Sequence, residues 1–273
     1  QVAVHVGGDE GIDMTLTAYE AALQANPRPD PRLRIEHGLF PTTSALQRIQ
    51  ANHIIVSTQP QWICWYGEGY TTMTDAATME KLLPLKTMLG MGIPLAFGCD
   101  VPASPYQEPK WAFYGATMRR SWTSGTYFNP AEKLNMHEAL RIHTMGSAYA
   151  GYADSVTGSL EPGKYADLVV WSHDLYNMEP SEANDLTALM TMGGGRIEYD
   201  TGIDTTTAVS IKDAPLVPSD LRLLQNYPNP FNPSTLIRFE LGGPARVRLY
   251  ICNIRGEHVR TLTHRWASGG IHA

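Results

Sequence analysis

Short apolar runs alternate with amphipathic stretches over the first part of the chain. The runs have the length of buried β-strands, and they cover residues 2–5, 33–37, 54–57 and 93–98. After the first run, apolar side chains recur at steps of three and four, which places them on one face of a helix: Ile12, Leu16, Tyr19 and Leu23. Further helices are expected around Leu46 and after Pro84. The alternation predicts four successive βα units with parallel strands and right-handed crossovers.

Four βα units are half of an eight-stranded parallel barrel, which needs ~250 residues. A doubly wound open sheet also alternates in this way, but its Gly-rich phosphate fingerprint follows none of the four runs. The chain starts at Gln1 and enters a buried-type strand at once. The pattern therefore predicts an α/β fold, the second half of a (β/α)8 TIM-type barrel, in a fragment of a longer protein. Residues 59–74, polar and aromatic, are expected to form a long loop.

The pattern changes after the fourth unit. A helix is expected over 135–150, followed by turn residues and two short strands at 166–171 and 195–199. No partner strand is evident near them in the sequence. We expect them to pair with strands outside this chain, within a first domain of residues 1–200.

The last third of the chain has the composition of a linker and an appended module. Residues 201–218 are rich in Thr, Asp, Pro and Ser, which predicts a linker. Alternating apolar residues then predict strands at 236–241 and 245–251, joined by a Gly-Gly-Pro turn. Residues 219–273 are therefore expected to form a separate small β-module that is itself cut short.

Composition narrows the class of protein. The net charge is −6, and 18% of the residues are charged. This balance argues against nucleic acid as a partner. No run approaches the ~18 apolar residues of a membrane-spanning helix, so no transmembrane segment is expected. Three scattered cysteines suit neither a disulfide framework nor a structural zinc site.

Three of the predicted strands end on side chains that can bind metal. His5 ends the first, His37 the second, and Asp100 follows the fourth. Zinc and similar ions take imidazole nitrogen and carboxylate oxygen, and parallel barrels build their sites at the carboxyl ends of strands. One such residue is more often a satisfied polar group at a strand end. Three with the same placement predict a metal or catalytic site.

These segments resemble the amidohydrolase superfamily, and within it the YtcJ-like subgroup called amidohydrolase family 3. The resemblance covers about residues 1–200 and is carried by four segments: Val4-His5-Val6-Gly7-Gly8-Asp9, Arg34-Ile35-Glu36-His37, Pro94-Leu95-Ala96-Phe97-Gly98-Cys99-Asp100 and Gly158-Ser159-Leu160-Glu161-Pro162-Gly163-Lys164-Tyr165-Ala166-Asp167. It implies that His5, His37 and Asp100 end barrel strands five, six and eight. It also implies that the strands at 166–171 and 195–199 belong to the small β-sandwich that accompanies the barrel in this family. It also implies one or two divalent ions, expected to be Zn²⁺, that activate water for attack on an amide or cyclic amide.

The resemblance also implies roles for individual residues. His5 would be a metal ligand, and His37 either a ligand or a donor to the substrate carbonyl. Asp100 would bind metal and carry the proton from the attacking water to the leaving nitrogen. Gln59 and Trp62, in a segment similar to the family's Gln-Pro-x-His, would contact a small amide-type substrate, with Trp62 in the place of the family's His.

Two departures from the family pattern bear on activity. The family's His-x-His pair of strand one and its Lys or Glu of strand four are not in this chain, so the fragment alone is expected to be inactive. Cys99 stands where the family usually has Ser.

The C-terminal part resembles a different family. Leu224-Gln225-Asn226-Tyr227-Pro228-Asn229-Pro230-Phe231-Asn232-Pro233, with Gly256 and the later Ala267-Ser268-Gly269-Gly270, is similar to type IX secretion C-terminal sorting domains. The resemblance implies a small all-β, Ig-like module, a partner in the bacterial secretion machinery and a secreted or cell-surface location.

Two other functions stay open at this point. One is a secreted binding protein whose barrel has lost its metal, and the other is a deaminase of the same superfamily. A His-x-His pair in the preceding half of the protein would favour an enzyme over a binding protein, and trials of substrates would separate amide hydrolysis from deamination.

Overall fold

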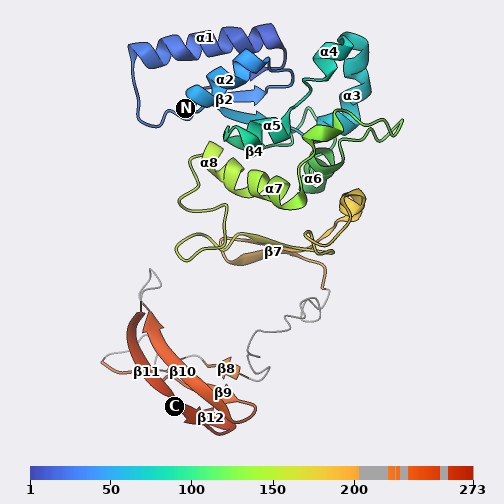
Figure 1. The fold of residues 1–273 in the computed structure, drawn as a ribbon. Coiled ribbons are helices and arrows are strands. Elements are labelled where there is room, and N and C mark those ends of the chain that lie inside the picture. Colours follow the sequence, from blue (N-terminus) through green and yellow to red (C-terminus); the bar gives the residue numbers. More distant parts are fainter. Residues whose placement is uncertain (203–220, 225, 228–232, 253–257, 273) are drawn as a thin grey trace. The chain divides into compact units, whose positions relative to one another are not determined.

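A computed structural model describes the chain except for residues 203–220, 225, 228–232, 253–257 and 273 (Figure 1). The chain divides into two units, Gln1–Gly202 and Ile203–Ala273. The predicted linker, 201–218, falls almost entirely outside the described residues, and so does most of the segment 224–233 that resembles a sorting domain.

The four predicted strands form one parallel sheet in the first unit. They are β1 (Ala3–Val6), β2 (Arg34–His37), β3 (Ile55–Thr58) and β4 (Leu95–Phe97), in the order β1-β2-β3-β4. The register pairs His5 with Glu36, Glu36 with Ser57 and Ser57 with Ala96. Because the strands are parallel, their carboxyl ends lie at one edge of the sheet. The prediction of four parallel βα units is confirmed, whereas closure into a barrel remains a prediction.

Helices cover this sheet. The first connections are made by α1 (Asp9–Ala25), α2 (Thr43–Ala51) and α5 (Leu85–Gly90). The predicted stripe on α1 is buried at Ile12, Leu16 and Tyr19. These side chains join a continuous core with β2 and β3, which includes Ile35 and Val56. In Figure 1, α1 and α2 lie toward one side of the strands, and α7 and α8 toward the other.

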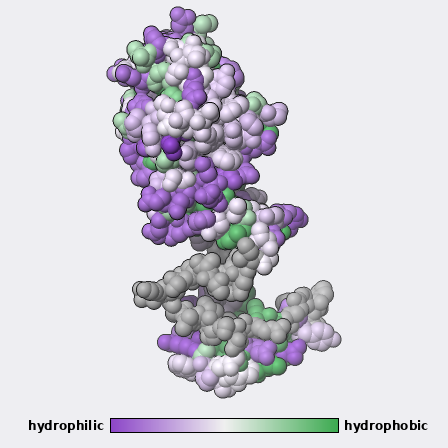
Figure 2. All heavy atoms as spheres, turned by 90° about the vertical axis from the view of Figure 1, so that its right-hand side faces the viewer, coloured by the Kyte–Doolittle hydropathy of each residue, from purple (hydrophilic) through white to green (hydrophobic). Residues whose placement is uncertain are grey.

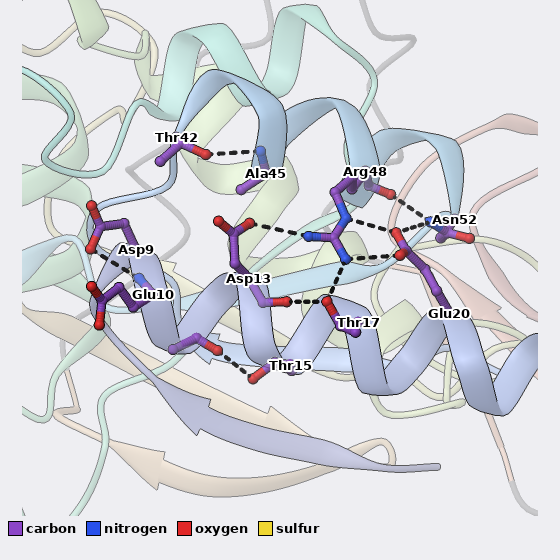
Figure 3. A network of polar contacts seen from close by, with 11 residues as sticks. Asp9, Glu10, Asp13, Thr15, Thr17, Glu20, Thr42, Ala45, Arg48 and Asn52 are labelled. Carbon is purple, nitrogen blue, oxygen red and sulfur yellow. Dashed lines mark hydrogen bonds and ion pairs between the residues drawn. The ribbon is translucent and has the colours of Figure 1, made fainter.

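A polar network ties α1 to α2 on the outside of this core (Figure 3). The guanidinium of Arg48, in the last turn of α2, donates to both carboxylate oxygens of Glu20 at 2.8 and 2.9 Å. It also reaches Asp13 at 3.2 Å and Thr17 at 3.0 Å. The paired guanidinium holds the pKa of Glu20 below its usual range. One bidentate arginine thus fixes the two helices side by side.

The segment predicted as a long loop is helical, so that prediction is wrong. It forms α3 (Gln61–Met73) and the short α4 (Ala76–Met79). The buried residues Ile63, Cys64, Gly67 and Tyr70 follow helical spacing. Their apolar contacts with the core stabilise a helix despite two glycines and several aromatic residues, which have low helix propensity.

The next helices complete the first unit's helical part. The helix α6 (Pro109–Met118) follows β4 and was not predicted. The helix predicted at 135–150 is present as α7 (Met136–Arg141), a π-helical turn η2 (Ile142–Gly146) and α8 (Ser147–Ala150), with a capping box of Asn135 and Glu138. The π-turn lies against β4. A short 3₁₀ turn, η1 (Pro130–Glu132), precedes α7.

The π-turn approaches β4 so closely that only glycine fits at its end. A Cβ on Gly146 would lie 2.1 Å from the carbonyl oxygen of Leu95. Gly146→Ala is therefore expected to lower the free energy of unfolding by about 2 kcal/mol or more, because backbone must shift. Urea denaturation followed by circular dichroism measures this. Gly90→Ala is the control, since no atom lies within 4 Å of its added Cβ; a loss as large in the control would contradict the explanation.

The two strands predicted after the helices have a partner within the chain. β5 (Leu168–Trp171), β6 (Ala188–Gly193) and β7 (Arg196–Asp200) form an antiparallel sheet in the order β5-β6-β7. The expectation that they pair with strands outside the chain is wrong, because β6 lies between them. Its sequence, Ala-Leu-Met-Thr-Met-Gly, lacks β-branched residues apart from Thr and gave no strand signal. A 3₁₀ turn, η3 (Pro180–Asp185), precedes β6.

The second unit is all-β where it is described. It contains β8 (Leu221–Leu223), β9 (Phe239–Leu241), β10 (Ala245–Cys252), β11 (His258–Ala267) and β12 (Gly270–His272). β10 pairs with β11, and β12-β9-β8 form a second antiparallel sheet. Phe239, Leu241 and Ala267 make a small core. The two predicted strands are thereby found, while the Ig-like topology stays a prediction.

The surface of the first unit is mixed. The face drawn in Figure 2 is mostly hydrophilic, with small hydrophobic areas scattered over it. Among the described helices, none combines the length and the apolar content needed to cross a membrane.

Candidate functional site

Two imidazole rings meet at the carboxyl ends of β1 and β2. His5 Nδ1 lies 3.0 Å from His37 Nε2, and the rings are edge to face with centroids 4.4 Å apart. His37 is buried, whereas His5 is exposed. Parallel pairing of β1 with β2 accounts for the meeting, because both residues lie in the last two positions of their strands. The expectation that strand-end residues gather is confirmed for this pair.

The ring of His37 is held by two residues that follow β3. Its Nδ1 lies 2.7 Å from Oε1 of Gln59, whose side chain is also buried. The indole of Trp62 stacks on a face of the imidazole ring, with centroids 4.9 Å apart and an angle of 17° between the planes. Both residues named by sequence for substrate contact therefore touch His37.

The backbone at the site adopts an uncommon conformation. His37 has φ 73° and Asp100 has φ 56°, both in the left-handed region. Few non-glycine residues occupy it, and such residues cluster at functional sites. Gly38, with φ 56°, continues the turn after His37. A residue with left-handed backbone at a strand end turns the chain sharply. Its side chain then no longer follows the alternation between the two faces of the sheet.

Asp100 lies at the same edge of the sheet, after β4. Gly98 N donates to the Thr58 carbonyl at 3.0 Å, so the hydrogen bonds between β3 and β4 continue one residue beyond β4. Gln61 Nε2 donates to the Gly98 carbonyl at 3.2 Å. The carboxylate is half-buried. Within the described residues, however, no group of three or more His, Cys, Asp or Glu side chains is close enough to share a metal ion. Asp100 as a third ligand stays a prediction.

The paired imidazoles fit one metal ion. Two nitrogens bound to zinc at about 2.0–2.1 Å each lie about 2.8–3.4 Å apart, for angles between a right angle and the tetrahedral angle. The 3.0 Å between His5 Nδ1 and His37 Nε2 falls in this range. The contact of His37 Nδ1 with Gln59 is the outer hydrogen bond that metal-binding histidines usually make.

Residues on either side of the turn from β3 into α3 carry buried polar atoms without a partner. In the part of the chain that the structure describes, Oγ1 of Thr58, Oε1 of Gln61 and Nε1 of Trp62 are buried and form no hydrogen bond. Thr58 ends β3, and Gln61 and Trp62 begin α3. Unpaired buried polar groups are rare because each costs about 1–3 kcal/mol. Gln61 was not among the predicted site residues, although it lies inside the segment that resembles the family.

Aromatic side chains anchor the loop that follows Asp100. The ring of Tyr106 contacts Trp65 of α3, Trp111 of α6 and Trp122, with centroid distances of 5.6, 5.3 and 4.3 Å. From the sequence alone, the aromatic side chains of residues 61–70 could either line a substrate pocket or pack the segment onto the rim of the barrel. These contacts give Trp65 a packing role, and the same cluster fixes the path of residues 100–106.

The cysteines near the site differ in accessibility. Burial raises the pKa of the Cys64 thiol to about 12, and Cys99, beside Asp100, is half-buried. Because the thiolate is the reactive form, we expect Cys64 to react with iodoacetamide at pH 8 at least about 10-fold more slowly than Cys99. Peptide mass spectrometry measures both rates. In urea the two rates should become similar; equal rates in the native protein would contradict the assignment.

Two histidines meet at the strand ends of a parallel α/β sheet, and a buried glutamine holds the ring of one of them, His37. The chain belongs to the amidohydrolase family, whose model matches residues 1–199. An N-substituted formamide deformylase of Arthrobacter pascens is 31% identical over 201 residues, which are 73% of this chain and 36% of that protein. A Bacillus subtilis protein named as amidohydrolase YtcJ is 28% identical over 73% of this chain and 37% of its own length.

A solved structure agrees with this assignment. The crystal structure of an uncharacterized metal-dependent hydrolase from Pyrococcus furiosus is 28% identical with a TM-score of 0.51, over 61% of this chain and 32% of that one. The chain thus spans about a third of the length of the relatives it matches.

Proposed function

We propose that the protein containing this chain is a metal-dependent hydrolase of a C–N bond in an amide or cyclic amide. The observation that carries the proposal is the pair of nitrogens, His5 Nδ1 and His37 Nε2, 3.0 Å apart at the carboxyl ends of adjacent parallel strands. Family membership supports it, as does the similarity to a deformylase and to a protein named as an amidohydrolase.

Each residue of the site has a defined task in this proposal. His5 and His37 hold a divalent ion, which we expect to be Zn²⁺. When bound, such an ion lowers the pKa of water and polarises a carbonyl. The carboxylate of Asp100 accepts the proton from the attacking water and returns it to the leaving nitrogen. Trp62, with an unpaired indole N–H beside His37, offers a hydrogen bond to the substrate.

Metal content of the full-length protein tests the proposal. We expect one or two equivalents of zinc or a similar ion by elemental analysis, lost in His5→Ala. His53→Ala is the control, because His53 follows α2 at the other end of β3, away from the paired imidazoles. Absence of bound metal after reconstitution would favour a binding protein without catalysis. Retention of full metal content in His5→Ala would remove His5 from the site.

We propose in addition that residues 219–273 direct the protein out of the cell through type IX secretion machinery. The resemblance of 224–233 to sorting domains and the separate second unit support this. Deletion of 219–273 in a bacterium with that machinery should keep the protein inside the cell, as measured by immunoblots of cell and medium. Equal export with and without the module would contradict the proposal.

A further inference from the structure

The side chain of Gln59 contacts a histidine of the site, not open space. Gln59 Oε1 lies 2.7 Å from His37 Nδ1, and the two residues are only 3% and 4% exposed. In the structure the amide oxygen of Gln59, and not its NH2 group, faces Nδ1; an oxygen can only accept a hydrogen bond, so this orientation requires the proton on Nδ1 of His37. A neutral imidazole protonated at Nδ1 has its lone pair on Nε2. That nitrogen is the one that faces His5.

The position of Gln59 is fixed by the sheet. It follows directly after β3, and the preceding carbonyl, of Thr58, accepts from Gly98 N at the end of β4. Its own carbonyl accepts from Trp62 N at 3.0 Å, in the first turn of α3. On one side the amide group of Gln59 reaches His37 at the end of β2. On the other side it lies near Gly98, because a Cβ added to Gly98 would be 3.7 Å from Nε2 of Gln59.

Trp62 and Gln59 thus determine different properties of the imidazole ring of His37. Trp62 stacks on His37 and fixes the plane of the imidazole. Stacking does not depend on which ring nitrogen carries the proton. The hydrogen bond from Nδ1 of His37 to Gln59 determines the position of the proton. We propose that Gln59 is a positioning residue, which holds His37 in the tautomer that presents an unprotonated Nε2 toward His5. The contribution of Gln59 to catalysis rests on the proposed function. The tautomer of His37 does not depend on that proposal.

This role differs from the substrate contact that the family resemblance implied. The Oε1 atom of Gln59 accepts from His37, and the side chain is buried, which favours contact with the ring over contact with a substrate. Metal affinity is the property it should govern, since loss of an outer hydrogen bond to a ligand lowers affinity about 10–100-fold.

The test is ¹⁵N NMR of histidine-labelled full-length protein without metal, at a pH where the ring is neutral. We expect His37 to be protonated at Nδ1 in the wild type and in Gln59→Glu, which keeps an acceptor. Gln59→Leu should lose this preference and bind Zn²⁺ about 10–100-fold more weakly by calorimetry. Gln61→Leu is the matched control, because Gln61 bonds the Gly98 carbonyl and should leave the tautomer of His37 unchanged.

Either of two results would overturn the proposal: His37 protonated at Nε2 in the wild type, or an unchanged tautomer in folded Gln59→Leu. If Gln59→Leu does not fold, the wild type and Gln59→Glu still decide the tautomer. If the wild type shows the expected tautomer but binds no Zn²⁺, the proposed function fails and the positioning role of Gln59 stands.

Discussion

Asp100→Asn is expected to lower kcat of the full-length protein by about 10²–10⁴-fold, the usual contribution of a proton-transferring group. Asparagine keeps the size of the side chain and tolerates the left-handed backbone at φ 56°, so the fold should survive. It cannot accept and return a proton as a carboxylate does. Steady-state kinetics on an amide substrate, with circular dichroism to verify folding, measures the effect.

An exposed carboxylate provides the comparison for Asp100. Asp200 ends β7 and accepts from Gly202 N at 2.8 Å, away from the strand-end histidines. Asp200→Asn should leave kcat within about twofold of the wild type, since surface substitutions away from a site have small effects. A wild-type kcat in Asp100→Asn would remove Asp100 from the proposed mechanism.

Arg119→Met is expected to lower the free energy of unfolding by about 3 kcal/mol. Arg119 is fully buried, and its guanidinium donates to the carbonyls of Leu82, Leu83 and Phe128 at 2.6, 2.9 and 2.8 Å. Burial lowers its pKa to about 10, so it remains charged at neutral pH. Methionine fills much of the space but donates no hydrogen bond, and each buried carbonyl left without a donor costs about 1–3 kcal/mol.

Urea denaturation of the chain, followed by circular dichroism, measures this loss. Arg196→Met is the matched control, because the side chain of Arg196 is 80% exposed and pairs with Glu198 on the surface of β7. The control should change stability by less than about 0.5 kcal/mol. A similar small effect for Arg119→Met would show that its three hydrogen bonds do not stabilise the fold.

Part of the site could be predicted because it depends on local pattern. An apolar run followed by His is visible in sequence, and parallel pairing then requires His5 and His37 to lie at one edge. The partners of His37 could not be derived in this way. Gln59 and Trp62 come from a different βα unit, 22 and 25 residues further along, and their contacts depend on side-chain packing between units.

The errors have related causes. The segment 59–74 has low helix propensity, yet its buried face packs on the core as α3. The strand β6 has weak β-propensity, yet it forms the centre of its sheet because both edges are satisfied by β5 and β7. The π-turn η2 and the buried Arg119 have no local signature, since each is stabilised by groups distant in sequence.

The sequence by itself determined the four parallel strands, the helix stripe of α1 and the histidines at the strand ends, because period and chain direction are local properties. Only the tertiary structure decided that His5 and His37 come within 3.0 Å and that Gln59 holds His37. The physical reason is that a hydrogen bond or a ligand set requires distances within a fraction of an ångström, which are set by the packing of several elements at once.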